Sequence, residues 1–408
     1  PVGKGPLEGR GCVSRIKRLG NEVLAVRFLH LADLHIGKRL NEFNLIEDQT
    51  YILDQIVEIA QAEQVGGVLI AGDVYDKSQP SIEAVELLDD FLTRLTSLGL
   101  SVCMISGNHD SPERLSFGSR MLEKTNLYVA GGFDGQLKKI RLADTHGPLN
   151  VYLLPFLKPP QIRPFFQGKI ETYDQAIQAV LRTGALDKNE RNILIAHQFV
   201  VSGDILPERS DSETMIVGGL DAVDASLFTD FDYVALGHLH RPQRIGLETI
   251  RYGGSPLKYS FSEARQDKQV TLADLGPKGQ IKLEHFPLKP KRDLREIKGP
   301  LAELLRLGLE EREGSKDYLR ITLTDEEEIY DALGQLRPVF PNLMVLEFEN
   351  SRTQFGSQAQ MAAAGDLAEK SPLELFASFY ELQNGRELKE EEIAILEEVF
   401  QEAGGAEV

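Results

Sequence analysis

The sequence predicts an α/β fold, because apolar runs of strand length alternate with stretches that have helical apolar spacing. Its 408 residues, 42% of them hydrophobic, suffice for one large domain with a sizeable core and for smaller units. The pattern is clearest over residues 26–110, which read as strand, helix, strand, helix, strand. This order favours a mainly parallel, doubly wound sheet whose functional site lies at the carboxyl ends of its strands.

The first strand is expected in VRFLHLADLH, which begins at Val26 and runs into a loop. A helix over residues 45–64, the buried strand GGVLIAGD, a helix near residues 80–97 and the strand SVCMISGNHD follow. The runs VYLLPF, NILIAHQFV and FDYVALGHLH repeat the arrangement at wider spacing. IRYGGSP, QVTLADL and QIKLEHFPL look like antiparallel strands, so an α/β sandwich over residues 28–288 is predicted.

A second, smaller α+β unit is predicted over residues 289–350. Five of the ten residues from Lys289 to Lys298 are basic, and this segment is interpreted as a hinge and a first strand. A helix from Pro300, the strand DYLRITLT, a helix from Thr324 and the strand NLMVLEFE follow. Thr324 and Glu327 have the spacing of a capping box, which supports the second helix.

Both ends of the chain differ from these units. Residues 1–27, with six basic residues and two acids, are expected to be a disordered or non-native extension. Residues 351–370 resemble a linker, and residues 371–408 are predicted to form two short helices, one with Leu375, Phe379 and Leu382 on a common face. Such apolar faces require either a partner surface or docking on the chain's own domain.

The composition indicates an intracellular protein. No apolar run approaches the roughly 20 residues that a membrane helix requires. Cys12 and Cys103 cannot build a disulfide framework, and Cys103 lies in an apolar run typical of a buried thiol. The net charge of −18 argues against unaided binding to nucleic acid and favours a partner with basic surface.

Side chains that can bind divalent cations lie at or just beyond the ends of predicted strands. They are Asp33 and His35, Asp73, Asn108 and His109, His197, and His238 and His240. If the first strand continues, Asp33 and His35 face one side, and the same spacing applies to His238 and His240. Alone, each is more often a capping acid or a loop histidine, but together they predict one metal site. His30, His146 and His285 are interpreted as structural or surface residues.

Two chemical details follow from residue type. Asp73 ends a buried strand after Gly72, and its two carboxylate oxygens could bridge two cations. Asn108 offers a neutral oxygen, which keeps the ligand charge low enough for an anionic phosphate to enter. His109, the next residue along, would point away from that ligand and remain free to contact substrate.

The motifs D-x-H, GD-x-x-D, GNHD, a lone His and GHLH, in this order, resemble those of the calcineurin-like metallophosphoesterases. GNHDSPERL, GHLHRPQ, YGGSPLKYSFSE and SPLELFASFYELQNGREL resemble more narrowly the SbcD family of bacterial nucleases and its archaeal and eukaryotic relatives. The resemblance spans about residues 28–404. It implies a four-layer metallophosphoesterase sandwich with a DNA-binding cap and C-terminal helices.

The resemblance also implies an activity, namely Mn²⁺-dependent cleavage of DNA in repair, recombination and replication, as exonuclease and endonuclease. One metal would be held by Asp33, His35, Asp73 and His240, and the other by Asp73, Asn108, His197 and His238. His109 would be the catalytic, substrate-contacting residue. The expected partners are DNA and an SbcC-type ATPase whose coiled coil receives the C-terminal helices, in a heterotetramer that contains a homodimer, in the cytoplasm near the nucleoid.

One departure and two alternatives remain. Archaeal and eukaryotic members tend to have a second His three residues after the bridging Asp, whereas this chain has Asp76, so a role for that His is in doubt. A phosphatase or nucleotidase would share the metal site. Phosphatases of this superfamily resemble one another in the motif GD-x-x-D-R-G, whereas Lys77 and Ser78 follow Asp76 here, so the arginine that would bind a phosphomonoester is missing. A non-catalytic scaffold is disfavoured by the intact set of ligands.

Overall fold

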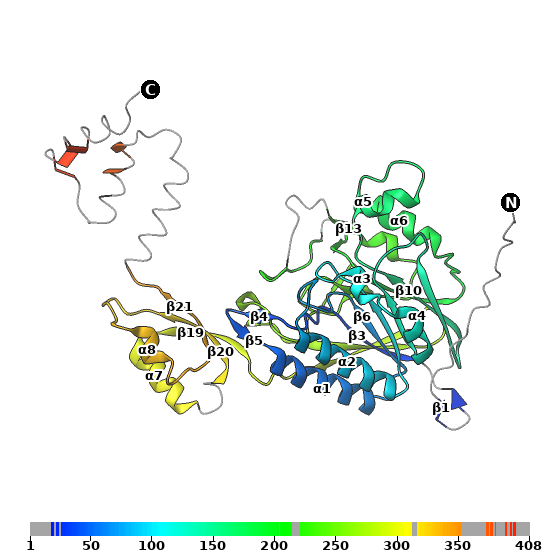
Figure 1. Cartoon of the computed structure of the whole chain (residues 1–408), viewed down its shortest axis with the longest axis horizontal. Helices are drawn as coiled ribbons and strands as arrows, with labels where there is room; N and C mark the ends of the chain where they lie inside the picture. Colours follow the sequence, from blue (N-terminus) through cyan, green and yellow to red (C-terminus); the bar gives the residue numbers. More distant parts are fainter. Residues whose placement is uncertain are drawn as a thin grey trace. The chain divides into compact units, whose positions relative to one another are not determined.

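The computed structural model describes residues 26–203, 205–213, 221–311 and 316–351, the backbone of 18–19 and 22–23, and residues 373–374, 376–377, 380, 388–389, 392–393 and 395–396. The chain divides into two compact units, Pro1–Arg295 and Glu296–Val408 (Figure 1). Within the described residues, no helix is both long enough and apolar enough to cross a membrane.

The first unit contains a sheet with the strand order β18-β17-β3-β6-β7-β8. Its parallel strands are β3 (Arg27–Leu31), β6 (Gly67–Ala71), β7 (Ser101–Ile105) and β8 (Leu127–Ala130). β17 (Gln269–Leu275) runs antiparallel to both β3 and β18 (Ile281–Pro287). β6 and β7 are buried along their whole length, which explains their unbroken apolar sequence.

A second sheet has the order β15-β16-β14-β11-β10-β9. β16 (Leu247–Tyr252), β14 (Tyr233–Gly237), β11 (Arg191–His197) and β10 (Gly147–Leu154) are parallel. β15 (Gln243–Ile245) and β9 (Lys138–Asp144) are its antiparallel edges. Apolar side chains of both sheets, among them Leu69, Ile105, Val151 and Ile193, form one buried cluster between the sheets.

Helices complete the layers. α1 (Ile46–Ala62) and α2 (Ile82–Ser97) pack together, and α2 contacts β7 of the first sheet. α2 begins where the Ser81 hydroxyl accepts a hydrogen bond from the amide of Ala84, and it buries Leu88 and Phe91. α6 (Tyr173–Thr183) begins with a capping box and contributes to a core with the second sheet. The first unit is therefore a helix, sheet, sheet, helix sandwich.

Shorter elements connect these layers. They are β4 (Arg39–Leu40), β5 (Phe43–Asn44), α3 (Pro112–Leu115), α4 (Ser119–Leu122), η1 (Glu123–Thr125), α5 (Pro159–Ile162), η2 (Arg163–Phe165), β12 (Val200–Val201), β13 (Val223–Asp224), η3 (Ala225–Phe228) and η4 (Phe261–Glu263). Near the amino terminus, the backbone of β1 (Arg18–Leu19) pairs with that of β2 (Glu22–Val23).

The predicted strands and helices of the first unit are confirmed, with two corrections. The strands form two facing sheets, which confirms the four-layer sandwich that the resemblance implies and corrects the single doubly wound sheet that the alternation of strands and helices favours. The strand IRYGGSP was expected to be antiparallel, but β16 is parallel to β14. The reason is that β15 forms the edge of the sheet, and the chain returns from it antiparallel into the position beside β14.

The second unit contains a sheet ordered β19-β20-β21, from β19 (Leu294–Gly299), β20 (Tyr318–Leu323) and β21 (Leu343–Phe348), the last two parallel. Side chains of α7 (Leu301–Glu310), of α8 (Ala332–Leu336) and of the sheet form the hydrophobic core of this unit, which includes Leu304, Ile321 and Phe340. This architecture agrees with the predicted β-α-β-α-β order.

The predicted helix start at Thr324 is wrong. α8 begins at Ala332, where the Asp331 side chain accepts a hydrogen bond from the amide of Gly334. The acidic side chains after Thr324 accept hydrogen bonds from distant residues instead of from a helix start. Asp325 accepts from the amide of Leu301, and Glu326 accepts from the hydroxyl of Ser351. Residues 1–17 and 352–372 and most of the predicted C-terminal helices, including Leu375, Phe379 and Leu382, lie outside the described residues.

Candidate metal centre

The predicted ligands come from four loops and one strand end, which meet where the two sheets face each other. Asp33 and His35 follow β3, Asp73 follows β6, Asn108 follows β7, His197 ends β11, and His238 and His240 follow β14. Contacts cross between the sheets at this edge: the Nδ1–H of His197 donates to the carbonyl of Ala71 (2.8 Å), and the amide of His238 donates to Asp33 Oδ1 (2.9 Å). The carboxyl ends of parallel strands thus converge, as the sequence predicts.

The backbone at these positions is unusual. Asp33, His35, Asp73 and His238 have positive φ angles of 51°, 43°, 45° and 103°. Such conformations cost about 1–3 kcal/mol each for residues other than glycine and persist where the surroundings hold them. Here backbone hydrogen bonds join the loops, from the amide of Asp33 to the carbonyl of Gly72 (3.1 Å) and from His35 to Asp73 (2.9 Å).

This geometry corrects one premise of the sequence interpretation. Asp33 and His35 were expected to share a face because the first strand would continue through them, but β3 ends at Leu31. Their side chains come together through two left-handed residues of the loop instead.

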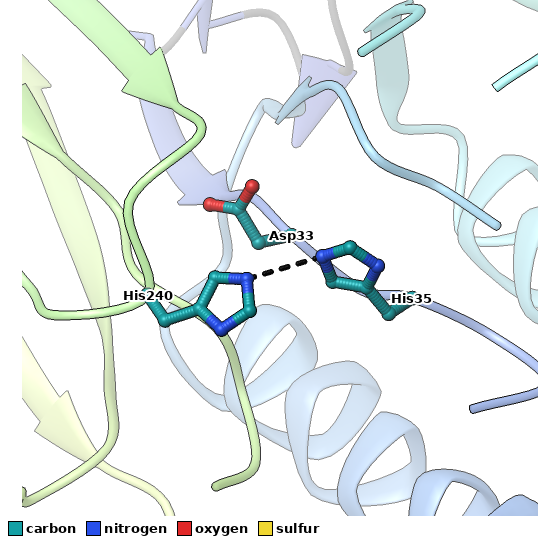
Figure 2. A group of neighbouring side chains, drawn as sticks. All are labelled: Asp33, His35 and His240. Atoms are coloured by element: carbon teal, nitrogen blue, oxygen red, sulfur yellow. Dashed lines mark hydrogen bonds between the residues drawn. The ribbon is translucent and has the colours of Figure 1, made fainter. Parts of the chain in front are cut away.

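One cluster consists of Asp33, His35 and His240, whose candidate ligand atoms lie within 4.8 Å of one another (Figure 2). The Nε2 atoms of His35 and His240 are 3.1 Å apart. Asp33 is fully buried, and among the described residues no hydrogen-bond donor reaches its Oδ2 atom. Burial, together with nearby acids, raises the pKa of Asp33 well above its usual range. A cation at this point would satisfy the unpaired oxygen.

A second cluster surrounds Asn108. Its Oδ1 atom lies 3.0 Å from Nε2 of His197 and 3.0 Å from Nδ1 of His238. A carbonyl oxygen only accepts, so the bond to Ala71 requires the hydrogen on Nδ1 of His197 and turns the Nε2 lone pair of the neutral ring toward the cluster. Electron-pair donors therefore face one another, which is the arrangement that a cation stabilises.

Asp73 lies between the two clusters. Its Oδ2 atom is 3.4 Å from Nε2 of His197 and 3.7 Å from Nε2 of His35, and its Oδ1 atom accepts the amide of His109 at 2.9 Å. Burial opposes the charge on both partners, but their mutual attraction outweighs it. The pKa of Asp73 is lowered and that of His197 is raised to about 9.

The structure brings all seven predicted ligands into these two clusters, and they overlap. Asp33, Asp73 and His197 also have candidate ligand atoms within 4.8 Å of one another, and Asp33 Oδ1 is 4.0 Å from His197 Nδ1. Gly72 makes the approach of His197 possible, because a Cβ atom at this residue would overlap the His197 ring. Its φ of +84° also favours glycine.

His109 lies beside the first cluster and is partly exposed. Its Nδ1–H donates to the carbonyl of Asp76 at 2.9 Å, which leaves Nε2 available, and its ring meets the His35 ring edge-on at 4.8 Å. Asp76 Oδ1 lies 2.8 Å from the Lys38 ammonium and 3.6 Å from His35 Nδ1. Burial opposes its charge, but His35 and Lys38 lower the pKa of Asp76 to about 2.

Several supporting residues were not predicted. Asp110 accepts hydrogen bonds from the amides of Val74, Tyr75 and Gly107, which joins the loops after β6 and β7. Gln49, from α1, donates to the carbonyl of His35 at 2.7 Å and accepts the amide of Gly37 at 2.9 Å. Asp110 stands inside GNHD and could have been inferred from the motif, whereas Gln49 has no comparable signal in the sequence.

The chain matches two family models. Residues 26–242 match the family model described as calcineurin-like phosphoesterase, and residues 290–384 match one described as type 5 capsule protein repressor C-terminal domain. A dimetal phosphatase from Danio rerio is similar in structure at 12% identity and a TM-score of 0.37, over 64% of this chain and 96% of its own.

Two curated relatives are each named as the SbcD subunit of nuclease SbcCD. The protein from Staphylococcus epidermidis is 36% identical over 326 residues, which cover 79% of this chain and 85% of that protein. The protein from Staphylococcus saprophyticus is 37% identical over 327 residues, which cover 79% of this chain and 84% of that protein. Sequence identity at this level over most of both chains establishes that this chain and these relatives belong to one family. The chain therefore belongs to the calcineurin-like phosphoesterases and, within them, to the SbcD family of nuclease subunits, and it is a metal-dependent phosphodiesterase.

Proposed function

We propose that the protein is a Mn²⁺-dependent DNA nuclease, with exonuclease activity on duplex ends and endonuclease activity on single strands and hairpins, that acts in DNA repair and recombination. The observation that carries the proposal is the pair of donor clusters with Asp73 between them. Two cations that share one carboxylate are typical of enzymes that hydrolyse phosphoesters. The relatives are named as subunits of a nuclease, which supports a nucleic acid as the substrate.

In this proposal Asp33, His35 and His240 hold one cation, Asn108, His197 and His238 hold the other, and Asp73 binds both. The unpaired Asp33 Oδ2 and the facing donors around Asn108 support a fit to divalent metal. When bound, two such cations supply Lewis-acid chemistry, which neutralises phosphate charge and lowers the pKa of water.

The protein's own groups perform the remaining tasks. The partly exposed His109 is the candidate to contact the substrate, and its Nδ1–H is fixed on the Asp76 carbonyl, so Nε2 remains available. With both ring nitrogens protonated, His109 would donate from Nε2 a hydrogen bond to the phosphate or a proton to the leaving oxygen. His197, held by Ala71, keeps its lone pair directed inward.

The charge distribution supports an assembly. The basic hinge is largely engaged, because Lys291 and Arg292 pair with Glu47, Arg292 also pairs with buried Asp48, and Lys298 pairs with Glu349. Together with the net charge of −18, these pairings favour a partner that supplies basic surface to phosphate. We propose that an SbcC-type ATPase with a coiled coil supplies that surface, in a complex that contains two copies of this chain and acts on nucleoid DNA in the cytoplasm.

End-labelled linear duplex, hairpin DNA and a phosphomonoester distinguish the activities. Each substrate is incubated with the full chain and Mn²⁺, with and without the ATPase partner and ATP, and with EDTA as control. Mn²⁺-dependent DNA cleavage that greatly exceeds monoester turnover is expected. Faster turnover of the monoester than of either DNA substrate would contradict the proposal and favour a phosphatase or nucleotidase.

A further inference from the structure

A buried polar network lies behind His240, on the side of the ring away from the donor clusters. Its members are Ser212, Glu263 and Lys268, contributed by a loop, by η4 and by the segment before β17. Glu263 is fully buried and Lys268 is 5% exposed. Charged side chains at this depth destabilise a fold unless they are paired, so a network of this kind calls for an explanation.

The two oxygens of Glu263 have different partners. Oε2 is held by the Lys268 ammonium at 2.6 Å, which also donates to the carbonyl of His240 at 2.8 Å. Oε1 lies 3.2 Å from Nδ1 of His240 and accepts from the Ser212 hydroxyl at 2.6 Å. Lys268 thus anchors one oxygen, and the other is presented to the histidine ring.

This pattern determines where the hydrogen of the neutral His240 ring resides. The Ser212 hydroxyl donates to Glu263, so its oxygen accepts from Nδ1 of His240, 2.8 Å away. A carboxylate oxygen also only accepts. Both neighbours therefore require the hydrogen on Nδ1, and the Nε2 lone pair faces His35 across 3.1 Å.

We propose that Glu263 is a positioning residue for the metal centre: it fixes the tautomer and orientation of His240 so that Nε2 binds the cation shared with Asp33 and His35. Histidine ligands commonly donate their second ring N–H to a carboxylate, and loss of such a partner costs about 10–100-fold in metal affinity. Lys268 holds the carboxylate in place. This inference rests on the proposed role of His240 as a ligand.

A Glu263→Gln variant tests the charge and the hydrogen bond together. The Lys268 ammonium would attract the amide oxygen, so the amide N–H₂ would face Nδ1 of His240, where an acceptor is required. The double variant Glu263→Met with Lys268→Met removes both charges at similar volume, which protects folding. It leaves the ring only the Ser212 hydroxyl, which no longer donates to Glu263 and therefore no longer has to accept from Nδ1. Asp144→Asn is a matched control, because Asp144 forms a buried ion pair with Arg191 on β9 and β11.

The measurement is calorimetric titration of each full-length variant with Mn²⁺ alone, together with its melting temperature without metal. The wild type is expected to bind two cations. In Glu263→Gln and in the double variant, the affinity for one cation falls about 10–100-fold and that for the other changes little. Asp144→Asn is expected to lower the melting temperature and retain both affinities.

A His240→Ala variant distinguishes failure of the role of Glu263 from failure of the role of His240 as a metal ligand. If it loses one cation while both Glu263 variants bind two cations as tightly as the wild type, the inference about Glu263 is overturned and the metal centre stands. If the wild type binds no Mn²⁺, or His240→Ala binds as the wild type does, the assignment of His240 fails, and the inference fails with it. Equal weakening in Asp144→Asn would also overturn the inference, because loss of stability alone would then explain the effect.

Discussion

Nε2 of His197 lies 3.4 Å from Oδ2 of Asp73, in a place where both side chains are almost completely buried. The same carboxylate oxygen lies 3.7 Å from Nε2 of His35 in the other cluster. One oxygen atom thus links histidines that come from different sheets, through the loops after β3 and β6 and the end of β11.

Asp73→Ala is expected to remove both cations and to abolish Mn²⁺-dependent DNA cleavage, because Asp73 is the candidate ligand common to both clusters. Cation stoichiometry and cleavage of end-labelled DNA provide the measurements. Asp134→Ala, at an exposed acid, serves as the control and should leave both unchanged. Two cations bound by Asp73→Ala would show that this carboxylate does not bridge them.

His109→Ala is expected to retain both cations and to lose about 10²–10⁴-fold in cleavage rate, the usual contribution of a positioned acid or hydrogen-bond donor. The reason is that His109 is partly exposed beside the first cluster and is fixed by Asp76 instead of by the other candidate ligands. Loss of a cation in this variant would reassign His109 to the metal. His146→Ala, on the exposed surface, is the control.

Gly72→Ala is expected to reduce Mn²⁺ affinity and cleavage, because the added Cβ would displace the His197 ring. Gly147→Ala is a matched control: Gly147 has a similar positive φ of +94°, but a Cβ there meets no atom within 4 Å. Both variants should lose about 1–2 kcal/mol of stability through backbone strain, and only Gly72→Ala should lose metal. Equal metal affinities in the two variants would refute the role of Gly72.

Mn²⁺ affinity is expected to rise with pH. Burial opposes the charged ring of His197, but Asp73 outweighs it and raises its pKa to about 9, so the metal-free protein carries a proton there at neutral pH. A cation must displace that proton, and the apparent affinity should increase about tenfold per pH unit below about 9. Titration calorimetry in buffers of different ionisation enthalpy measures the released proton. An affinity that is flat between about pH 6 and 8 would contradict this linkage.

The sequence located the candidate ligands better than their surroundings. Asp33, Asp73, Asn108 and His197 lie at strand ends, and periodicity locates strand ends because a buried parallel strand is an unbroken apolar run. The local geometry was less accessible. Asp33 and His35 were grouped correctly for a wrong reason, since the left-handed loop that joins them depends on hydrogen bonds to Gly72 and Asp73.

Residues behind the ligands could not be predicted for a related reason. Glu263 and Lys268 reach His240 through tertiary contacts, and no local pattern distinguishes them from surface charges in the same segment. The supposed capping box at Thr324 failed in the same way, because its acids found distant partners, Leu301 and Ser351. Periodicity indicates which element forms, whereas tertiary contacts decide where a polar side chain binds.

Anomalous diffraction from crystals of the full chain soaked in Mn²⁺ tests the central claim most directly. We expect two peaks about 3.5–4 Å apart on either side of Asp73, one near Asp33, His35 and His240 and the other near Asn108, His197 and His238. A single peak, or peaks away from these side chains, would contradict the two-metal centre.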